Sequence, residues 1–308
     1  MGDAPNRIMI GMPMFNEEET VGTIVQLSRR HADEVVCIDD GSSDHSARIA
    51  EAAGATVIRH RTNLGYGAAL KSLFNKARAD DVDVLIILDS DGQHDPNDVP
   101  RIIAPILADE ADLVIGSRFH QHGGSVAMPA YRRLGNKIIS MASNMTSDHN
   151  LRDTQSGFRA FSKKALSILR FEHNGMELSL EILDDAQEKQ LRMKEVPTII
   201  RYDVPKGSQY TAVSHGFSVL GYAFLTLSQK KPLLVLGLPG LGLVGTSISM
   251  GMDVIQKVTE RADGIVGEGM SAVFIGILGL TMCATGLVLQ SARTLLRHLV
   301  AKRFGITP

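Results

Sequence analysis

The chain has 308 residues, of which 44 % are hydrophobic and 21 % charged, and its formal net charge is −2. This length suits one large domain plus an additional element. The near-neutral charge gives no electrostatic indication of nucleic-acid binding, which would call for a strongly basic face, so we expect no nucleic-acid partner.

The first part of the chain alternates between segments typical of strands and of helices. Apolar runs at 7–13, 34–40 and 56–60 indicate strands. Asn16 is expected to be the N-cap of a helix that carries Glu17–Glu19 in its first turn. A second helix over 44–54 is expected to end at a glycine.

The next segments continue the alternation. The glycine-rich loop NLGYGAA (63–69) leads into another helix, and VDVLIILD (82–89) has the nearly continuous apolar character of a strand covered on both faces. A helix near 99–108 and a strand at 112–118 follow. The pattern predicts an α/β fold, with an open, mostly parallel sheet and helices on both faces.

Four of these strands end in polar groups. The groups are Pro13–Glu17, Asp39–Ser42, Asp89–Asp91 and Gly116–Arg118. In open parallel sheets, ligands bind beyond the carboxyl ends of the strands. Crowding acids there is unfavourable unless a cation lies among them.

The segment ILDSDGQHDP (87–96) carries the acids that suit a cation best. Asp89 and Asp91, with Gln93 close by, offer the hard oxygen ligands that Mg²⁺ or Mn²⁺ uses to hold a diphosphate. No phosphate-binding loop of the G-x-x-x-x-G-K-[ST] type is present, and Gly65 and Gly67 do not form a dinucleotide fingerprint. The two glycines serve either a donor-binding loop or only a tight turn into a helix.

The last part of the chain is apolar. Two runs without charged residues, at about 232–252 and 270–292, each reach the roughly 20 residues that cross a bilayer. Neither holds an ionisable residue, so we expect an anchor and not a transport path. Small residues four apart, Gly245 with Ser249 and Ser247 with Gly251, permit close helix approach and would suit a homo-oligomer.

Basic residues predict the orientation of this anchor. Lys230 and Lys231 precede the first run, and Arg293, Arg297, Lys302 and Arg303 follow the second. We therefore expect a multi-pass protein of the cell membrane whose soluble domain and both termini are cytoplasmic. Residues 206–231 predict an amphipathic helix in the membrane interface, or else one packed on the soluble domain. The expected parts are thus 1–205, 206–231 and 232–308.

Seven motifs together resemble one family. They are PMFNE (13–17), DDGSSD (39–44), NLGYG (63–67), DSDGQH (89–94), GSR (116–118), RRLGN (132–136) and DTQSGFR (153–159). The series is similar to that of family 2 glycosyltransferases, and resembles the dolichyl-phosphate mannose synthase branch over residues 7 to about 205. The resemblance implies a GT-A type fold and transfer of one sugar from a nucleotide-diphospho-sugar to dolichyl or another polyprenyl phosphate.

The resemblance also implies roles for individual residues. The nucleotide-sugar would be bound by Pro13, Phe15, Asn16, Glu17, Asp39, Asp40, Asp89, Ser90 and Asp91. The metal, Mg²⁺ or Mn²⁺, would be held by Asp89, Asp91 and Gln93. The acceptor phosphate would be gripped by Arg118, Arg132, Arg133 and Asn136, and these arginines together with Asp91 would carry the chemistry. The alternative is that the arginines belong to a solvated helix surface.

A phosphate acceptor simplifies the expected chemistry. With a second pKa of about 6, a phosphate monoester is already mostly a dianionic nucleophile at pH 7 and needs no general base. It needs positioning and screening from the donor's negative charge, which guanidinium groups supply. Direct displacement would invert the anomeric centre, so an α-linked donor should give a β-linked product.

The segment TIIRYDVPKGSQYT (198–211) departs from the family pattern. Arg201 comes early, Lys206 precedes Gly207 and Ser208, and no lysine follows that serine. Either cation could cover the donor, and GDP-mannose, a UDP-hexose and a UDP-N-acetylhexosamine all stay open. A membrane scaffold that binds nucleotide-sugar without turnover is the non-enzyme alternative. A processive polysaccharide synthase is disfavoured because the chain has no tryptophan for a Gln-x-x-Arg-Trp motif.

Overall fold

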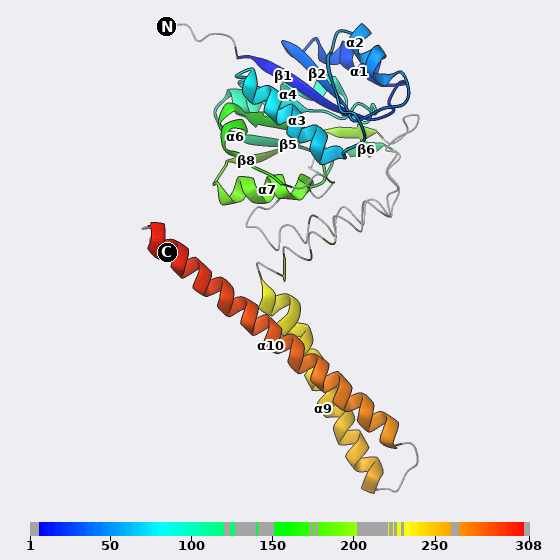
Figure 1. Cartoon of the computed structure of the whole chain (residues 1–308), viewed down its shortest axis with the longest axis vertical. Helices are drawn as coiled ribbons and strands as arrows, with labels where there is room; N and C mark the ends of the chain where they lie inside the picture. The colour runs from blue at the N-terminus through cyan, green and yellow to red at the C-terminus, as the bar shows by residue number, and fades with distance from the viewer. Residues whose placement is uncertain are drawn as a thin grey trace. The chain divides into compact units, whose positions relative to one another are not determined.

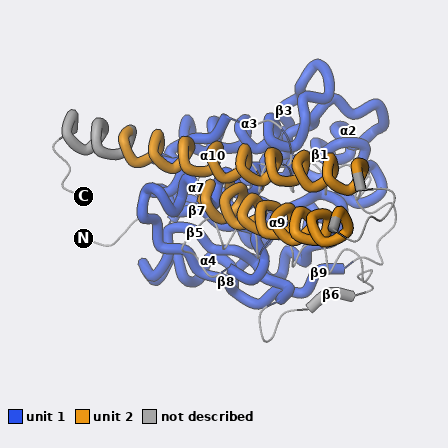
Figure 2. The backbone as a smooth tube through the Cα atoms, turned by 90° about the horizontal axis from the view of Figure 1, so that it is seen from below, with its two compact units in different colours: residues 1–223 blue, residues 224–308 orange. Residues whose placement is uncertain are grey.

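The computed structural model describes most of the chain in two compact units, residues 1–223 and 224–308 (Figure 2). The described residues are 6–119, 124–126, 140, 151–172, 175, 178–201, 221, 224, 227–228, 231–259 and 265–304. The predicted interfacial helix at 206–231 lies almost wholly outside them and stays a prediction.

The first unit is built on a seven-stranded sheet with the order β3-β2-β1-β4-β7-β5-β8 (Figure 1). Its strands are β1 (Ile8–Met14), β2 (Glu34–Asp39), β3 (Thr56–Arg59), β4 (Val84–Ile87), β5 (Leu113–Ser117), β7 (Arg159–Ser162) and β8 (Met193–Pro197). All neighbours are parallel except β7, which runs antiparallel between β4 and β5. A separate pair, β6 (Gly124–Val126) and β9 (Ile199–Arg201), is parallel.

Helices cover both faces of this sheet. One face carries α1 (Val21–Ser28), α2 (Ser46–Ala52) and α4 (Val99–Leu107), the last preceded by the 3-10 turn η1 (Pro96–Asp98); the other carries α3 (Tyr66–Ala79), α6 (Lys163–Ile168) and α7 (Leu178–Glu188). Successive buried strand residues alternate between the two cores, Leu85 facing α3 and Ile86 facing α1 and α4. The expected open, mostly parallel α/β sheet is confirmed.

The predicted start of the first helix is wrong. Asn16 has φ 58°, and α1 begins five residues later at Val21. The backbone N–H groups of Asn16 and Glu17 donate to the side chains of Ser42 (2.9 Å) and Ser46 (2.7 Å). Residues 16 and 17 are therefore bonded to the segment that follows β2, and the helix begins only after them. Local helix propensity cannot indicate such a contact between distant segments.

The second unit consists of two long apolar helices. The π-helical turn η2 (Leu233–Gly237) leads into α9 (Leu238–Thr259), and α10 spans Ile265–Phe304. The segments Leu233–Val258 and Val266–Leu295, with mean hydropathy 1.8 and 2.3, are long and apolar enough to cross a membrane. Each is longer than the run predicted from the sequence.

Small residues bring α9 and α10 into close contact. A Cβ added at Gly279 would lie 2.7 Å from the carbonyl oxygen of Gly240, and the Ser247 hydroxyl donates to the carbonyl oxygen of Ala272 (2.8 Å). Ser247, which the sequence suggested for self-association, thus lies at the contact within the hairpin. A Cβ at Gly245 would have no neighbour within 4 Å among the described residues, and self-association through that position stays a prediction.

Gly279→Ala should therefore destabilise the hairpin, because its methyl group would meet backbone and not a flexible side chain. We expect a loss of about 1–3 kcal/mol, the usual cost of overpacking. The matched variant Gly245→Ala should be neutral. The SDS mole fraction at the unfolding midpoint in mixed micelles, followed by circular dichroism, measures both. Equal midpoints for the two variants would contradict the close helix approach.

Candidate active site

The structure brings the predicted acids together beyond the carboxyl ends of β1, β2 and β4. Hydrogen bonds tie the acidic loop after β4 to its neighbours. The Ser90 hydroxyl donates to the carbonyl oxygen of Pro13 (2.9 Å), and the Thr20 hydroxyl donates to the carbonyl oxygen of Ser90 (2.7 Å). Ser90 is buried and its side chain holds the loop to β1, while its contact with a nucleotide-sugar stays a prediction.

Within this loop, Asp89 and Asp91 form a crowded pair of acids. The Asp91 carboxylate accepts the N–H of Gln93 (2.9 Å), and this hydrogen bond closes a turn of the chain. The Asp89 side chain is 31 % exposed to solvent. Burial first, and then the charges of Asp91 and Glu17, raise the pKa of Asp89 well above its usual value. The negative charges of Asp91 and Glu17 thus act on Asp89, and a cation there would relieve this repulsion.

Two buried arginines partly compensate this charge. Arg118, which is 8 % exposed, forms a bidentate pair with the fully buried Asp153, with Nε and Nη2 at 2.6 and 2.9 Å from the carboxylate oxygens. Arg159 donates to the carbonyl oxygens of Ser156, Ser179 and Thr154 at 2.8–2.9 Å. The charges of Arg118 and Arg159 both act to lower the pKa of Asp89.

The antiparallel strand explains why these residues reach the site. Because β7 runs against β4 and β5, it begins at the edge where they end, and Arg159 pairs with Ile87 on one side and Ile115 on the other. The preceding segment 153–158 therefore enters the site from outside the sheet. Gly157 lies so close that an added Cβ would be 2.6 Å from Oδ2 of Asp89, so a larger residue here would displace that carboxylate.

Asp40 is bonded to the glycine loop before α3 and to His60. Its carboxylate accepts the N–H groups of Leu64 (3.0 Å) and Gly65 (2.8 Å) and contacts Nδ1 of His60 (2.7 Å). The His60 Nε2 atom lies 2.9 Å from the Ser72 hydroxyl on α3. Asp40, which is 4 % exposed, thus anchors the glycine loop before α3.

Asp39 and Asn16 hold the neighbouring loop. Asp39 accepts the N–H of Ser42 (2.9 Å), and the Asn16 side-chain oxygen accepts the N–H of Ser43 (2.9 Å). Phe15 and Glu17 are half-buried beside them. The expected nucleoside-binding residues therefore share one edge, although contact with a nucleoside stays a prediction.

The loop with Gln93 also meets the strand that carries Arg201. The N–H of Arg201 donates to the carbonyl oxygen of Gln93 (2.9 Å), which places this exposed arginine next to the predicted metal ligands. The other predicted cations and amide, Arg132, Arg133, Asn136 and Lys206, lie outside the described residues. Their roles stay predictions, as does a phosphate-binding role for Arg118, whose guanidinium already pairs with Asp153.

Sequence reasoning did not assign a role to Tyr66, His94 or His60. Burial first, and then the charge of Asp89, raise the pKa of the Tyr66 phenol well above its usual value. Burial and the charge of Arg118 lower the pKa of His94 to about 3, so its ring is neutral at pH 7. His94 and Tyr66 lie inside the motifs quoted above, whereas nothing in the sequence distinguished His60.

The residues at this edge offer a divalent cation some of the ligands that it needs, but not a complete set. Asp89 and Asp91 supply two carboxylates with an acidic neighbour in Glu17, which favours a cation. Within the described part of the chain, no three His, Cys, Asp or Glu side chains converge as a metal-binding group. Hence a cation here would draw its remaining ligands from Gln93, water or a substrate diphosphate.

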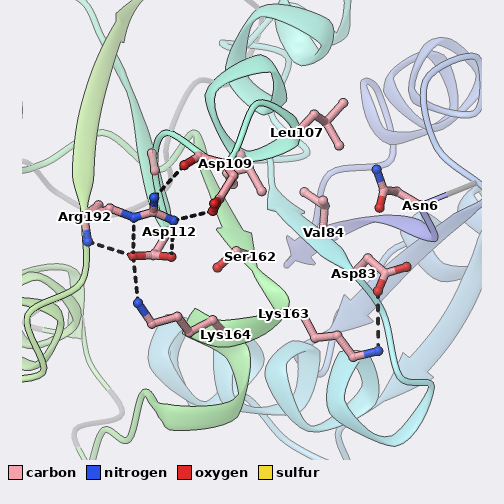
Figure 3. A pocket seen from close by; sticks show the side chains of 12 residues that line it. Asn6, Asp83, Val84, Leu107, Asp109, Asp112, Ser162, Lys163, Lys164 and Arg192 are labelled. Atoms are coloured by element: carbon pink, nitrogen blue, oxygen red, sulfur yellow. Dashed lines mark hydrogen bonds and ion pairs between the residues drawn. The ribbon is translucent and has the colours of Figure 1, made fainter. Parts of the chain in front are cut away.

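A cavity of about 280 Å³ lies elsewhere, at the amino ends of β4 and β5 (Figure 3). Its charged side chains pair with one another, as Arg192 does with Asp109 (2.6 Å) and with Asp112 (3.1 Å). Burial raises the pKa of Asp112, but hydrogen bonds from Arg192 and Lys164 outweigh it and bring that pKa to about 2. With its charges paired and its position at the opposite edge, this cavity is not the candidate active site.

Comparison with known proteins agrees with this arrangement. Residues 9–169 match the family model described as glycosyl transferase family 2. The chain belongs to glycosyl transferase family 2. It is 30 % identical to the UDP-N-acetylglucosamine–dolichyl-phosphate N-acetylglucosaminyltransferase of Methanococcus voltae, over 75 % of this chain and 99 % of that protein. It is 28 % identical to the undecaprenyl-phosphate mannosyltransferase of Micrococcus luteus, over 62 % and 82 %.

Solved structures confirm the fold of this family 2 glycosyltransferase. Glucosyl-3-phosphoglycerate synthase from Mycobacterium tuberculosis, in complex with Mn²⁺, UDP and phosphoglyceric acid, superposes with a TM-score of 0.57. The match has 20 % sequence identity and covers 73 % of this chain and 78 % of the other. The predicted GT-A fold and the assignment as a glycosyltransferase are therefore confirmed.

The anchoring role of Asp40 can be separated from nucleoside binding. Asp40→Asn would place an amide N–H₂ among groups that now donate to Asp40, leaving buried N–H groups unpaired at a cost of about 1–3 kcal/mol. We expect a lower unfolding temperature in the absence of nucleotide. Asp81→Asn, at an exposed ion pair with Lys163, should change stability by less than about 0.5 kcal/mol. If Asp40→Asn weakens nucleotide binding but unfolds at the wild-type temperature, Asp40 is a nucleoside ligand and not an anchor.

Proposed function

We propose that this glycosyltransferase moves one sugar from a nucleotide-diphospho-sugar to a polyprenyl phosphate, with a divalent cation and with inversion at the anomeric carbon. The observation that carries the proposal is the pair of acids Asp89 and Asp91 in the loop after β4, where the charge of Glu17 acts on Asp89 as well. Acids crowded in this way favour a cation, and a diphosphate then becomes a natural further ligand. The names of the two polyprenyl-phosphate transferases among its relatives support the acceptor class.

The residues of the chain have separable tasks in this reaction. Asp89, Asp91 and Gln93 would hold Mg²⁺ or Mn²⁺, which when bound neutralises negative charge on the departing diphosphate. Asp39 and Asn16 shape the loop beside it, and Asp40 keeps the glycine loop in place. Arg201 lies next to Gln93 and is proposed to contact the donor, as is Lys206.

The acceptor needs cations more than it needs a base. Its phosphate is mostly dianionic at pH 7, so positioning against the donor's charge is the main requirement. Arg132, Arg133 and Asn136 are proposed to bind it, and Arg118 would contribute its charge from within the pair with Asp153. In-line attack by the phosphate oxygen gives a β-linked lipid phosphate from an α-linked donor.

The two C-terminal helices suit the location of such an acceptor. We propose that Leu233–Val258 and Val266–Leu295 anchor the enzyme in the bilayer, with the glycosyltransferase domain and both termini on the cytoplasmic side. A polyprenyl phosphate could then present its headgroup to the site while its tail stays in lipid.

A transfer assay tests the proposal. Membranes containing the full-length protein would receive dolichyl phosphate and radiolabelled GDP-mannose, UDP-glucose or UDP-N-acetylglucosamine, with and without Mn²⁺. We expect one labelled lipid with a β linkage, and its formation should fall more than about 100-fold without metal or in Asp91→Ala. Asp81→Ala, which removes an exposed acid far from these motifs, should retain full transfer.

The outcome also discriminates the alternatives. An α-linked product would contradict direct displacement, and a labelled lipid formed equally without metal would contradict the cation. Metal-dependent nucleotide-sugar binding with no labelled lipid from any donor would favour a different acceptor or a non-catalytic scaffold.

A further inference from the structure

His94 is held firmly at the edge of the site by its backbone and its ring. It forms an isolated antiparallel bridge with Ile200, and the neighbouring carbonyl oxygen of Gln93 accepts the N–H of Arg201 (2.9 Å). Its ring packs on Phe158, with centroids 5.2 Å apart. The imidazole is therefore fixed in place, with 4 % of its surface exposed.

The Nδ1 atom of this ring is buried and has no hydrogen-bond partner among the described residues. Leaving a buried polar atom unpaired costs about 1–3 kcal/mol, so such an atom calls for an explanation. The acid that faces it is Asp89, whose Oδ2 lies 3.7 Å from Nδ1. That distance is too long for a hydrogen bond but requires a movement of less than about 1 Å to become one.

The Asp89 carboxylate also lies close to the backbone of Gly157. A Cβ added at this glycine would come within 2.6 Å of Oδ2 and 3.2 Å of Oδ1. The His94 ring and Gly157 thus both lie next to the same carboxylate. A lone pair on Nδ1 would repel the carboxylate oxygen, so the tautomer that carries its proton on Nδ1 is favoured.

We propose that His94 is a positioning residue that donates its Nδ1–H to Asp89 Oδ2 and so orients this carboxylate toward the divalent cation. The inference rests on the proposed metal use of Asp89. Hydrogen bonds from an outer residue commonly fix the direction of a metal-binding carboxylate, and their loss weakens metal binding about 10–100-fold. The 3.7 Å separation shortens when the cation draws the carboxylate into its bound orientation.

Two substitutions separate hydrogen bonding from packing. His94→Asn keeps an N–H donor near the position of Nδ1 but removes the ring from Phe158. His94→Phe keeps a ring on Phe158 but removes the donor. A positioning role predicts that Asn preserves metal binding better than Phe, whereas a packing role predicts the reverse.

The test measures Mn²⁺ binding to the purified full-length protein in detergent, from the electron paramagnetic resonance signal of free Mn²⁺. His94→Phe should raise the dissociation constant about 10–100-fold, and His94→Asn by less than about threefold. Equal affinity of His94→Phe and wild type, or equal weakening by both variants, would overturn the proposal. Should His94→Phe fail to fold, His94→Gln, which places its amide nearer the Nε2 position, replaces it and should show the same loss.

Two further results distinguish a failure of the role proposed for His94 from a failure of the proposed metal site. Asp91→Ala should abolish Mn²⁺ binding; if wild type binds no Mn²⁺, or Asp91→Ala binds it equally, the metal site itself is wrong and the role of His94 fails with it. If wild type binds Mn²⁺ with a ¹⁴N hyperfine coupling that disappears in His94→Phe, His94 is a direct ligand, which would overturn its role as a donor.

Discussion

The crowding of carboxylates at one edge of the sheet is the constraint on which the site depends. Asp89, Asp91 and Glu17 are placed where negative charges repel, and burial strengthens that repulsion. The protein offers partial compensation through Arg118 and Arg159, but each is already bound, to Asp153 and to three carbonyl oxygens respectively. The remaining negative charge would favour a cation at this edge.

The topology makes this compensation possible. If every strand were parallel, only the chain segments that follow the strands would reach the carboxyl edge. The antiparallel β7 adds a segment that ends there, and it brings Asp153, Gly157 and Arg159 against the acids after β4. A mixed sheet therefore supplies the site with both its acids and the cations that surround them.

Much of this fold could be predicted from the sequence because its signals are local. The apolar runs of β1, β2 and β4 indicated the sheet, and the acids that follow them indicated that the predicted site residues share one edge of it. The start of α1 was wrong because Asn16 and Glu17 bond to Ser42 and Ser46, a contact between distant segments that no local pattern contains. For the same reason the sequence did not indicate that Asp40 anchors the loop at Gly65, or that Arg118 pairs with Asp153 across 35 residues.

The account's central claim is that this edge holds a divalent cation together with the donor's diphosphate. The most direct measurement is the ³¹P electron–nuclear double resonance spectrum of Mn²⁺ bound to the full-length protein in the presence of UDP. We predict a ³¹P coupling from a protein-bound Mn²⁺ complex that disappears in Asp91→Ala. A protein-bound Mn²⁺ signal without ³¹P coupling, or a spectrum identical to that of the Mn²⁺–UDP complex free in solution, would contradict the account.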